Sequence, residues 1–224
     1  DHILLQCENT RITKEGNGFS VETTQQGKPI TLKAGQVITT TGSYTLRSLL
    51  PFVGEEHLRN IENLQYAPVV MAAAGFKQWE GIHLDAFGGL VPTKEGRDSL
   101  GILFPSSIFQ SRAPRRGALL SVFLGGMKKT GLIESSDAEL EAIVINEIRE
   151  TMGIRDPKPD LLKIYRYPYA IPQYERSTEE RLKTIDRIES ENPGLHVAGN
   201  IRDGIGMADR VKQGALLASK LLEN

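Results

Sequence analysis

Short apolar runs separated by glycine turns dominate residues 3–41. Phe19 and Val21 alternate with polar neighbours, and alternation with a period of two is typical of half-buried strands. Asn17–Gly18 lies between two such runs, and Asn-Gly in that position is a strong hairpin signal. The segment "QVITTTG" predicts a more buried strand that ends at Gly42. We therefore expect a β-meander followed by one buried strand.

A helical segment and a second group of apolar runs follow. Residues 43–53 carry leucines spaced for one helical face, although Pro51 interrupts the pattern. "APVVMAAAGF" (67–76) predicts a strand, and "FGGLVP", "LGILFPSS" and "ALLSVFLGG" predict three more. Consecutive strands joined by short connections favour an antiparallel sheet.

Two later segments have helical periodicity and clear start signals. Residues 135–154 offer Ser135, Ser136 and Asp137 as N-caps and Gly153 as the residue that can end the helix. In "STEERLKTIDRIES", Ser177 followed by Glu180 predicts a capping box. Between the two helices, "LLKIYRYPYAIPQY" predicts another strand.

The tail "LHVAGNIRDGIGMADRV" predicts a strand over 195–199, a glycine turn and a helix over 205–222. N–H groups in the first turn of a helix lack intrahelical partners and attract anions. The dinucleotide fingerprint G-x-G-x-x-G is incomplete, because Asp209 occupies the third glycine position. The turn alone therefore indicates either a cofactor cradle or a tight structural connection.

Composition and charge exclude several classes of function. The 224 residues carry a net charge of −1, whereas a nucleic-acid surface usually shows a strong basic bias. The arginines at 112, 115 and 116 are interpreted as a solvated loop. A single cysteine permits no disulfide or cysteine-based zinc site within one chain. The four histidines are scattered, so we expect no metal site and identify no catalytic side chain.

Several segments together carry a family resemblance. "VAGNIRDGIGMADRVKQGALLA" resembles the C-terminal flavin motif of the FAD-dependent amine oxidase superfamily. "AFGGLVPTKEGRDSLGILFPSSIF", followed by "APRRGALLSVFLGG" and "YPYAIPQY", resembles the protoporphyrinogen oxidase family within it. The resemblance spans nearly the whole chain. It implies an α+β fold, FAD as the cofactor and a porphyrinogen as the substrate.

The resemblance also implies a domain organisation. Residues 1–64 would form part of an FAD-binding domain, residues 65–175 a substrate-binding domain with an antiparallel sheet and flanking helices, and residues 176–224 would return to the FAD-binding domain. The glycine fingerprint that grips the FAD diphosphate is absent from this sequence. Because the chain also starts at Asp1, directly before a strand, we expect it to be the C-terminal half of a longer enzyme and inactive alone.

Site residues are carried over from the resemblance position by position. Residues Phe87, Gly88 and Leu90 match the strand that packs against the tetrapyrrole, and Tyr174 lies near the flavin. The residues expected to contact FAD are Asn9, Gly199, Asn200, Gly204, Ile205, Gly206 and Met207. The position of Asn9 often holds valine in the family, which places its contact with the adenine end in doubt.

The implied reaction is oxidation of protoporphyrinogen IX to protoporphyrin IX in haem biosynthesis, with O₂ as acceptor. Two alternatives stay open: a coproporphyrinogen III oxidase of the same fold, and a non-catalytic module that binds a hydrophobic ligand. The sequence shows no signal peptide and no membrane-length apolar stretch. We therefore expect a cytoplasmic protein. The resemblance also allows peripheral contact with the cytoplasmic membrane, through the absent region, and a homodimer of the longer protein.

Overall fold

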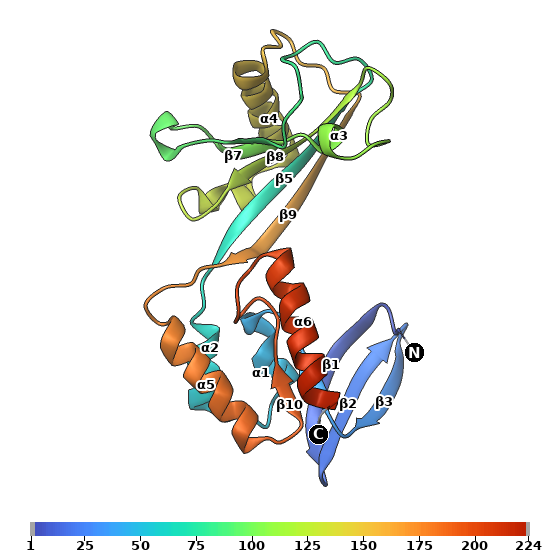
Figure 1. The fold of residues 1–224 in the computed structure, drawn as a ribbon, viewed down its shortest axis with the longest axis vertical. Helices are drawn as coiled ribbons and strands as arrows, with labels where there is room; N and C mark the ends of the chain where they lie inside the picture. Colours follow the sequence, from blue (N-terminus) through green and yellow to red (C-terminus); the bar gives the residue numbers. More distant parts are fainter. Residues whose placement is uncertain (1–2, 223–224) are drawn as a thin grey trace. The chain divides into compact units, whose positions relative to one another are not determined.

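The computed structural model describes residues 3–222, and the chain divides into two compact units (Figure 1). Unit 1 contains the residues up to Gln65 and those from Pro172 onward, and unit 2 contains Tyr66–Ile171. Both combine helices with strands, and their sheets contain antiparallel pairs, which confirms the expected α+β class.

Unit 1 is built from two segments that are far apart in the sequence. The first segment contributes four strands, a 3₁₀ turn and two helices, and the second contributes two helices and a strand. They are β1 (Cys7–Glu15), β2 (Gly18–Gln25), β3 (Lys28–Ala34), β4 (Val37–Thr39), η1 (Ser43–Thr45), α1 (Leu46–Leu49), α2 (Glu55–Glu62), α5 (Thr178–Glu191), β10 (Leu195–Val197) and α6 (Met207–Leu222).

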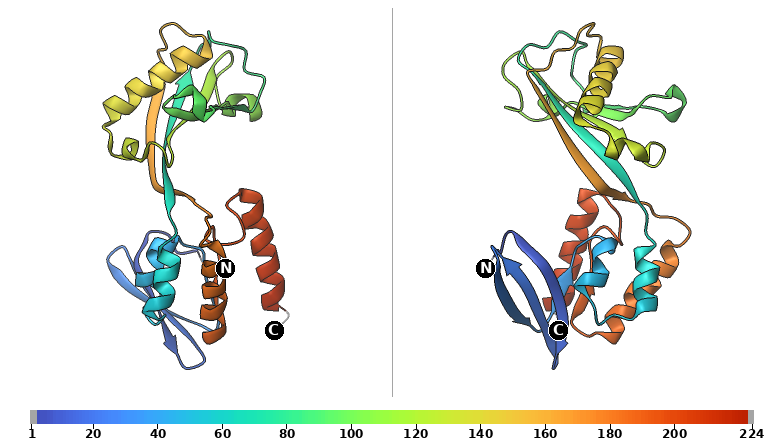
Figure 2. Two further views of the ribbon diagram at one scale, coloured as in Figure 1. Left: turned by 90° about the vertical axis from the view of Figure 1, so that its left-hand side faces the viewer. Right: turned by 180° about the vertical axis from the view of Figure 1, so that it is seen from behind.

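Strand pairing in unit 1 follows the predicted meander. β1, β2 and β3 form an antiparallel sheet, visible as a separate blue layer in Figure 2. The predicted final strand, β10, pairs in parallel with β4, and Val197 lies opposite Thr39. This pairing ties the end of the chain to its first segment. The backbone of β4 is thereby placed directly beside the turn that follows β10.

Unit 2 is a five-stranded sheet with a helix on one face. Its elements are β5 (Tyr66–Phe76), β6 (Gly88–Leu90), η2 (Thr93–Glu95), β7 (Ser99–Leu103), α3 (Pro105–Ile108), β8 (Ala118–Gly125), η3 (Thr130–Glu134), α4 (Asp137–Met152) and β9 (Leu161–Pro172). The strand order is β6-β7-β8-β5-β9. Helix α4 lies on one face of this sheet (Figure 2), and its buried side chains belong to the same core cluster as alternate residues of β5 and β8. The three strands predicted after β5 are confirmed as β6, β7 and β8, with antiparallel pairing.

Helix boundaries include one confirmed cap and two corrections. The Ser136 side chain accepts from the Glu139 N–H and completes a capping box, and Gly153 ends α4 with a φ of 71°. The capping box predicted at Ser177 is absent. The backbone of Ser177 already has helical angles (φ −71°, ψ −5°), whereas an N-cap residue needs extended ones for its side chain to reach the next turn. The helix predicted from residue 205 begins at Met207.

Candidate functional site

The glycine turn, defined as residues 199–206, connects β10 to α6. Gly199 has a φ of +92° and Gly204 a φ of +95°, values that only glycine adopts without strain. A side chain at Gly199 would place its Cβ 2.9 Å from the backbone oxygen of Thr40, beside β4. The turn therefore depends on glycine both for its conformation and for its close approach to the first segment of unit 1.

The N-terminus of α6 begins directly at this turn. The Gly206 N–H donates to Asp209 Oδ2 at 2.9 Å, so Asp209 caps one donor. Among the described residues, the N–H groups of Ile205, Met207 and Ala208 form no hydrogen bond with a protein acceptor. The side chain of Met207 is 84% exposed and that of Ile205 is 50% exposed. The start of α6 thus combines free N–H donors with exposed apolar side chains.

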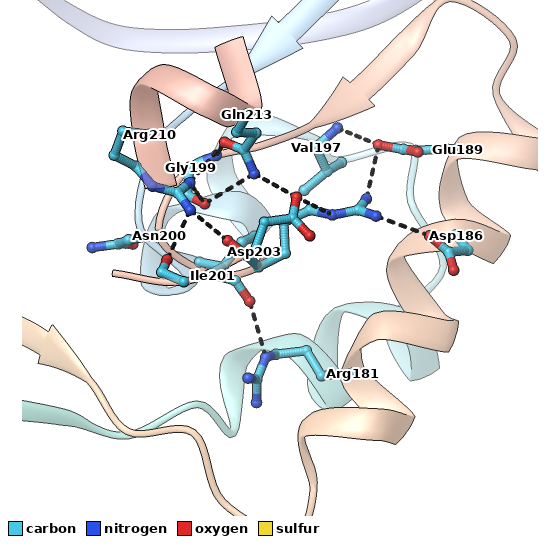
Figure 3. Close-up of polar contacts among 12 residues, drawn as sticks. Arg181, Asp186, Glu189, Val197, Gly199, Asn200, Ile201, Asp203, Arg210 and Gln213 are labelled. Atoms are coloured by element: carbon cyan, nitrogen blue, oxygen red, sulfur yellow. Dashed lines mark hydrogen bonds and ion pairs between the residues drawn. The ribbon is translucent and has the colours of Figure 1, made fainter. Parts of the chain in front are cut away.

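Arg210, on the first turns of α6, reaches back into the glycine turn. Figure 3 shows its guanidinium beside the carbonyl groups of the turn. Its Nη1 donates to the carbonyl oxygen of Gly199. Its Nη2 lies 2.8 Å from the carbonyl oxygens of both Arg202 and Gly204. Gln213 supports this arrangement, because its Oε1 accepts from Arg210 Nη1 at 2.7 Å and from the Gly199 N–H at 2.9 Å.

Two further side chains hold the turn from the opposite direction. The Tyr174 hydroxyl lies 2.9 Å from the carbonyl oxygen of Asn200 and 3.2 Å from that of Gly204. Arg181, which is 2% exposed, donates from Nε to the carbonyl oxygen of Ile201 at 3.2 Å. The Arg181 guanidinium also stands over the Tyr174 ring, 5.2 Å from its centroid, a cation–π distance. Burial raises the pKa of Tyr174, so its hydroxyl stays protonated and able to donate.

We call Tyr174, Arg181 and Arg210 the carbonyl clamp. Together they bind the carbonyl oxygens of residues 199–202 and 204. Because these oxygens are directed to protein donors, the groups left for a ligand are the N–H donors at the start of α6. A helix N-terminus carries a partial positive charge, so this arrangement favours an electron-rich or anionic group.

The structure places the predicted cofactor residues in two locations. Gly199, Asn200, Gly204, Ile205, Gly206 and Met207 all lie in the glycine turn or at the first residue of α6. Asn9 lies in β1, exposed, with a φ of +55°, at a bulge between Glu8 and Arg11. Within residues 3–222, no hydrogen bond or ion pair joins Asn9 to the glycine turn. Its contact with the adenine end stays a prediction.

The predicted substrate residues lie at one edge of the unit 2 sheet. Phe87 directly precedes β6, and its side chain is 65% exposed, while that of Leu90 is 85% exposed. Leu90 lies opposite Gly101 on β7, and Gly101 lies opposite Phe123 on β8. Residues directly opposite on neighbouring strands share one face. A row of apolar or small residues therefore crosses the sheet.

This row belongs to the face that α4 does not cover, which we call the open face. Met71 lies opposite Phe123 and continues the row onto β5. A second row contains Gly88, Leu103, Ser121 and Ala73. Neither row contains a charged residue. The open face therefore suits a flat, largely apolar ligand.

A pocket of about 470 Å³ lies between α5, β10 and α6, and Arg202 and Asp203 of the glycine turn form part of its wall. Its lining includes His196, Glu189, Arg202 and Leu216. The Nδ1 atom of His196 is buried and has no hydrogen-bond partner, and burial lowers the pKa of His196. The Glu189 carboxylate meanwhile accepts from the Val197 N–H at 2.8 Å and so caps the edge of β10.

Four residues of the site were not found by sequence reasoning. Arg181, Arg210 and Gln213 had no local signal, because their partners are carbonyl groups placed by the turn. Asp209 was interpreted only as the missing third glycine. Its position three residues after Gly206 is the spacing at which an acidic side chain caps a helix N-terminus, and that signal was available. Among residues 3–222, no cluster of three potential metal-ligating side chains exists, and no helix is long and apolar enough to cross a membrane.

Comparison with known families decides what the turn belongs to. The family model described as flavin containing amine oxidoreductase matches residues 1–221. The chain belongs to this family. The flavin-containing family establishes FAD as the cofactor, and the expected resemblance to protoporphyrinogen oxidases is confirmed.

The relatives of this flavin oxidoreductase chain are named as porphyrinogen oxidases. The mitochondrial protoporphyrinogen oxidase of Nicotiana tabacum is 32% identical over 170 residues, which cover 74% of this chain and 33% of that protein. Chloroplastic protoporphyrinogen oxidase 1 of Arabidopsis thaliana is 29% identical over an alignment that covers 95% of this chain and 42% of that protein. Coproporphyrinogen III oxidase of Bacillus subtilis (strain 168) is 24% identical, with 96% and 46% covered. The chain thus spans a third to a half of these relatives.

Solved structures confirm the fold of this family member. An Exiguobacterium sp. 255-15 protein, provisionally named a protoporphyrinogen oxidase, matches with a TM-score of 0.78 at 21% identity. The match covers 97% of this chain and 47% of that one. A putrescine oxidase variant matches with a TM-score of 0.66 at 14% identity, covering 97% and 48%.

The residues of the glycine turn fit FAD. A reduced flavin carries negative charge on its pyrimidine side, and the free N–H groups at the start of α6 are suited to receive it. Ile205 and Met207 offer exposed apolar surface to the flavin ring. Gly204 and Gly206 make room for the capping residue of α6, because a Cβ at either position would meet the Asp209 carboxylate. The side of the turn that binds the clamp is closed to a ligand, because its carbonyl oxygens already have protein partners.

Proposed function

We propose that this chain supplies the flavin-facing turn and the substrate sheet of an FAD-dependent oxidase that converts protoporphyrinogen IX to protoporphyrin IX. The observation that carries the proposal is the combination of free N–H donors at the start of α6 with the carbonyl clamp behind them. The names of the relatives support the substrate class. The FAD diphosphate would be held by a segment outside these residues, and the 224-residue chain alone would be inactive.

Bound FAD supplies the capacity to accept two electrons at a time, so removal of six electrons needs three cycles. O₂ is the proposed final acceptor, reduced to H₂O₂. The residues of this chain would bind and orient the flavin and the porphyrinogen. The N–H groups of Ile205 and Met207 would stabilise negative charge on the flavin pyrimidine ring. Gly88 and Leu90 would contact the macrocycle through the open face, and Phe87, which directly precedes β6, would contact it at the edge of the sheet.

Catalysis in this proposal needs no acid or base from the open face. Its two rows contain one hydroxyl, that of Ser121, and otherwise glycine, alanine and apolar side chains. Such a face would exclude water from the reacting carbon of the substrate. It would bind the macrocycle through a large apolar contact area. Specificity would therefore come from shape and from the apolar edge of the substrate.

Coproporphyrinogen III oxidation is the second candidate. The Bacillus subtilis relative covers 96% of this chain and is named for that substrate. Coproporphyrinogen III has four propionates where protoporphyrinogen IX has two propionates and two vinyl groups. The two rows carry no charged side chain, which favours the less anionic substrate against them, because a buried carboxylate without a partner is costly.

The test is an anaerobic preparation of both porphyrinogens, mixed aerobically with the FAD-reconstituted protein that contains this chain. Porphyrin fluorescence reports the product, and putrescine serves as an amine control. We expect the larger kcat/KM with protoporphyrinogen IX and no H₂O₂ from putrescine. A preference for coproporphyrinogen III would support the second candidate. Oxidation of putrescine alone would contradict both.

A further inference from the structure

The cation at the centre of the glycine turn has no carboxylate contact. Arg210 donates to the carbonyl oxygens of Gly199, Arg202 and Gly204, and its fourth acceptor is the amide oxygen of Gln213. Among the described residues, no acidic side chain forms an ion pair with Arg210. Its positive charge is therefore not neutralised by direct contact.

The same guanidinium fixes the geometry of the turn. Its three carbonyl partners belong to residues on both sides of Asp203, a non-glycine residue with a φ of +60°. Non-glycine residues in this region are uncommon and cost conformational energy. A planar fork of donors is suited to holding several carbonyl groups at once. Lysine has a single ammonium and cannot hold all three in the same arrangement.

The nearby acidic groups are already bound by other donors. Asp209 Oδ2 accepts from the Gly206 N–H at 2.9 Å, and Asp203 Oδ2 accepts from Gln213 Nε2 at 2.7 Å. Both carboxylates weaken the positive potential at the start of α6. Arg210 adds positive charge within the turn, where its guanidinium contacts three carbonyl oxygens.

We propose that Arg210 is a positioning residue that holds the N–H donors toward the flavin and that its charge raises the affinity of the flavin for electrons. This inference rests on the proposed function, because it requires a flavin at the start of α6. Two effects of one side chain are then expected: geometric, through the carbonyl groups, and electrostatic, through the charge.

The experiment uses the FAD-reconstituted protein that contains this chain and three flavin readouts. Sulfite forms a bond to N5 of oxidised flavin, and the negative charge that results on the pyrimidine side is stabilised by nearby positive charge. The variants are Arg210→Met, Arg210→Lys and the control Lys212→Met, which removes a charge from the exposed surface of the same helix. FAD content is measured by absorbance, sulfite affinity by bleaching, and midpoint potential by equilibration with a reference dye.

We expect Arg210→Met to weaken sulfite binding at least tenfold and to lower the midpoint potential. Arg210→Lys should recover most of the potential, which depends on charge, but less of the FAD affinity, which depends on geometry. Lys212→Met should change neither. Wild-type sulfite affinity and potential in FAD-loaded Arg210→Met would overturn the inference. If Arg210→Met does not fold, wild-type values for Arg210→Lys in all three measurements would overturn it. Failure of the wild-type protein to retain FAD would instead contradict the proposed function.

Discussion

The Tyr174 hydroxyl lies 2.9 Å from the carbonyl oxygen of Asn200, which joins the segment after β9 to the turn before α6. The two residues are separated by the whole of α5 and β10. The same hydroxyl lies 3.2 Å from the carbonyl oxygen of Gly204. One phenol therefore spans the turn that we assign to the flavin.

Removing the Tyr174 hydroxyl should loosen the glycine turn and leave the aromatic ring of residue 174 in place. Tyr174→Phe loses one donated hydrogen bond, shared between two carbonyl oxygens and worth about 1–2 kcal/mol, so we expect FAD affinity to fall about five- to thirtyfold. The measurement is a fluorescence titration of FAD. The control is Ser190→Ala on α5, which removes another hydroxyl bound to a carbonyl oxygen, that of Arg187 at 2.8 Å. Equal FAD affinities for Tyr174→Phe and wild type would show that the turn does not depend on Tyr174.

Two glycines of unit 1 should respond to alanine in opposite directions. Gly199→Ala forces a side chain into a φ of +92° and against the Thr40 backbone, so we expect a loss of about 1–3 kcal/mol in the free energy of unfolding. Gly214 lies inside α6, and a Cβ added there would meet no heavy atom within 4 Å outside its own helix backbone and chain neighbours. Gly214→Ala should therefore stabilise the protein by about 0.5–1 kcal/mol. Urea unfolding of both variants measures the difference, and two changes of the same sign would contradict it.

The open face should determine the KM for the porphyrinogen. Leu90→Ala removes apolar area that we expect to be buried by the substrate, at a cost of about 1.4 kcal/mol, or tenfold in KM. The kcat should change less, since the proposal places Leu90 against the macrocycle and not against the flavin. Leu32→Ala on β3, where the leucine is 46% exposed, is the matched control. An unchanged KM in Leu90→Ala would place the substrate elsewhere.

Stability should fall in mildly acidic solution because of His196. Its pKa is lowered in the folded chain, chiefly by burial, while the unfolded value is about 6.5. Between these two values the unfolded chain binds more protons, so the free energy of unfolding decreases as the pH falls below about 6.5. Well above pH 6.5, the titration of His196 no longer changes the free energy of unfolding.

The variant His196→Gln should flatten this part of the stability–pH curve. His83→Gln is the control, because the His83 side chain is 87% exposed. Denaturant titrations at several pH values provide the curve. If His196→Gln and wild type lose the same stability between pH 7 and the folded pKa, His196 is not the group responsible.

The sequence predicted most elements of the fold, because their signals are local. The meander follows from alternation and hairpin turns, and α4 follows from Ser136 and Gly153 at its ends. The capping box at Ser177 was wrong because the sequence motif does not reveal the backbone angles of the cap residue. Helix α2 was not predicted, since its eight residues contain only two buried side chains, Leu58 and Ile61.

The candidate site was predicted in part. The glycines at 199, 204 and 206 mark a turn that needs unusual backbone angles or close approach, and this information is in the sequence. The carbonyl clamp, in contrast, could not be predicted from the sequence. Arg181 and Arg210 look like ordinary helix-surface arginines, and their partners are carbonyl groups whose direction is fixed only after β10 pairs with β4. Spacing along the chain does not encode such contacts.

Amide hydrogen–deuterium exchange across residues 199–209, with and without FAD, tests the central claim most directly. The claim is that the N–H groups of Ile205, Met207 and Ala208 are free donors that face the flavin. We predict that FAD slows exchange at these amides, while amides of the unit 2 core, such as those of Leu120 and Val122, keep their rates. Bound FAD with unchanged exchange at the start of α6 would contradict the account and place the flavin elsewhere.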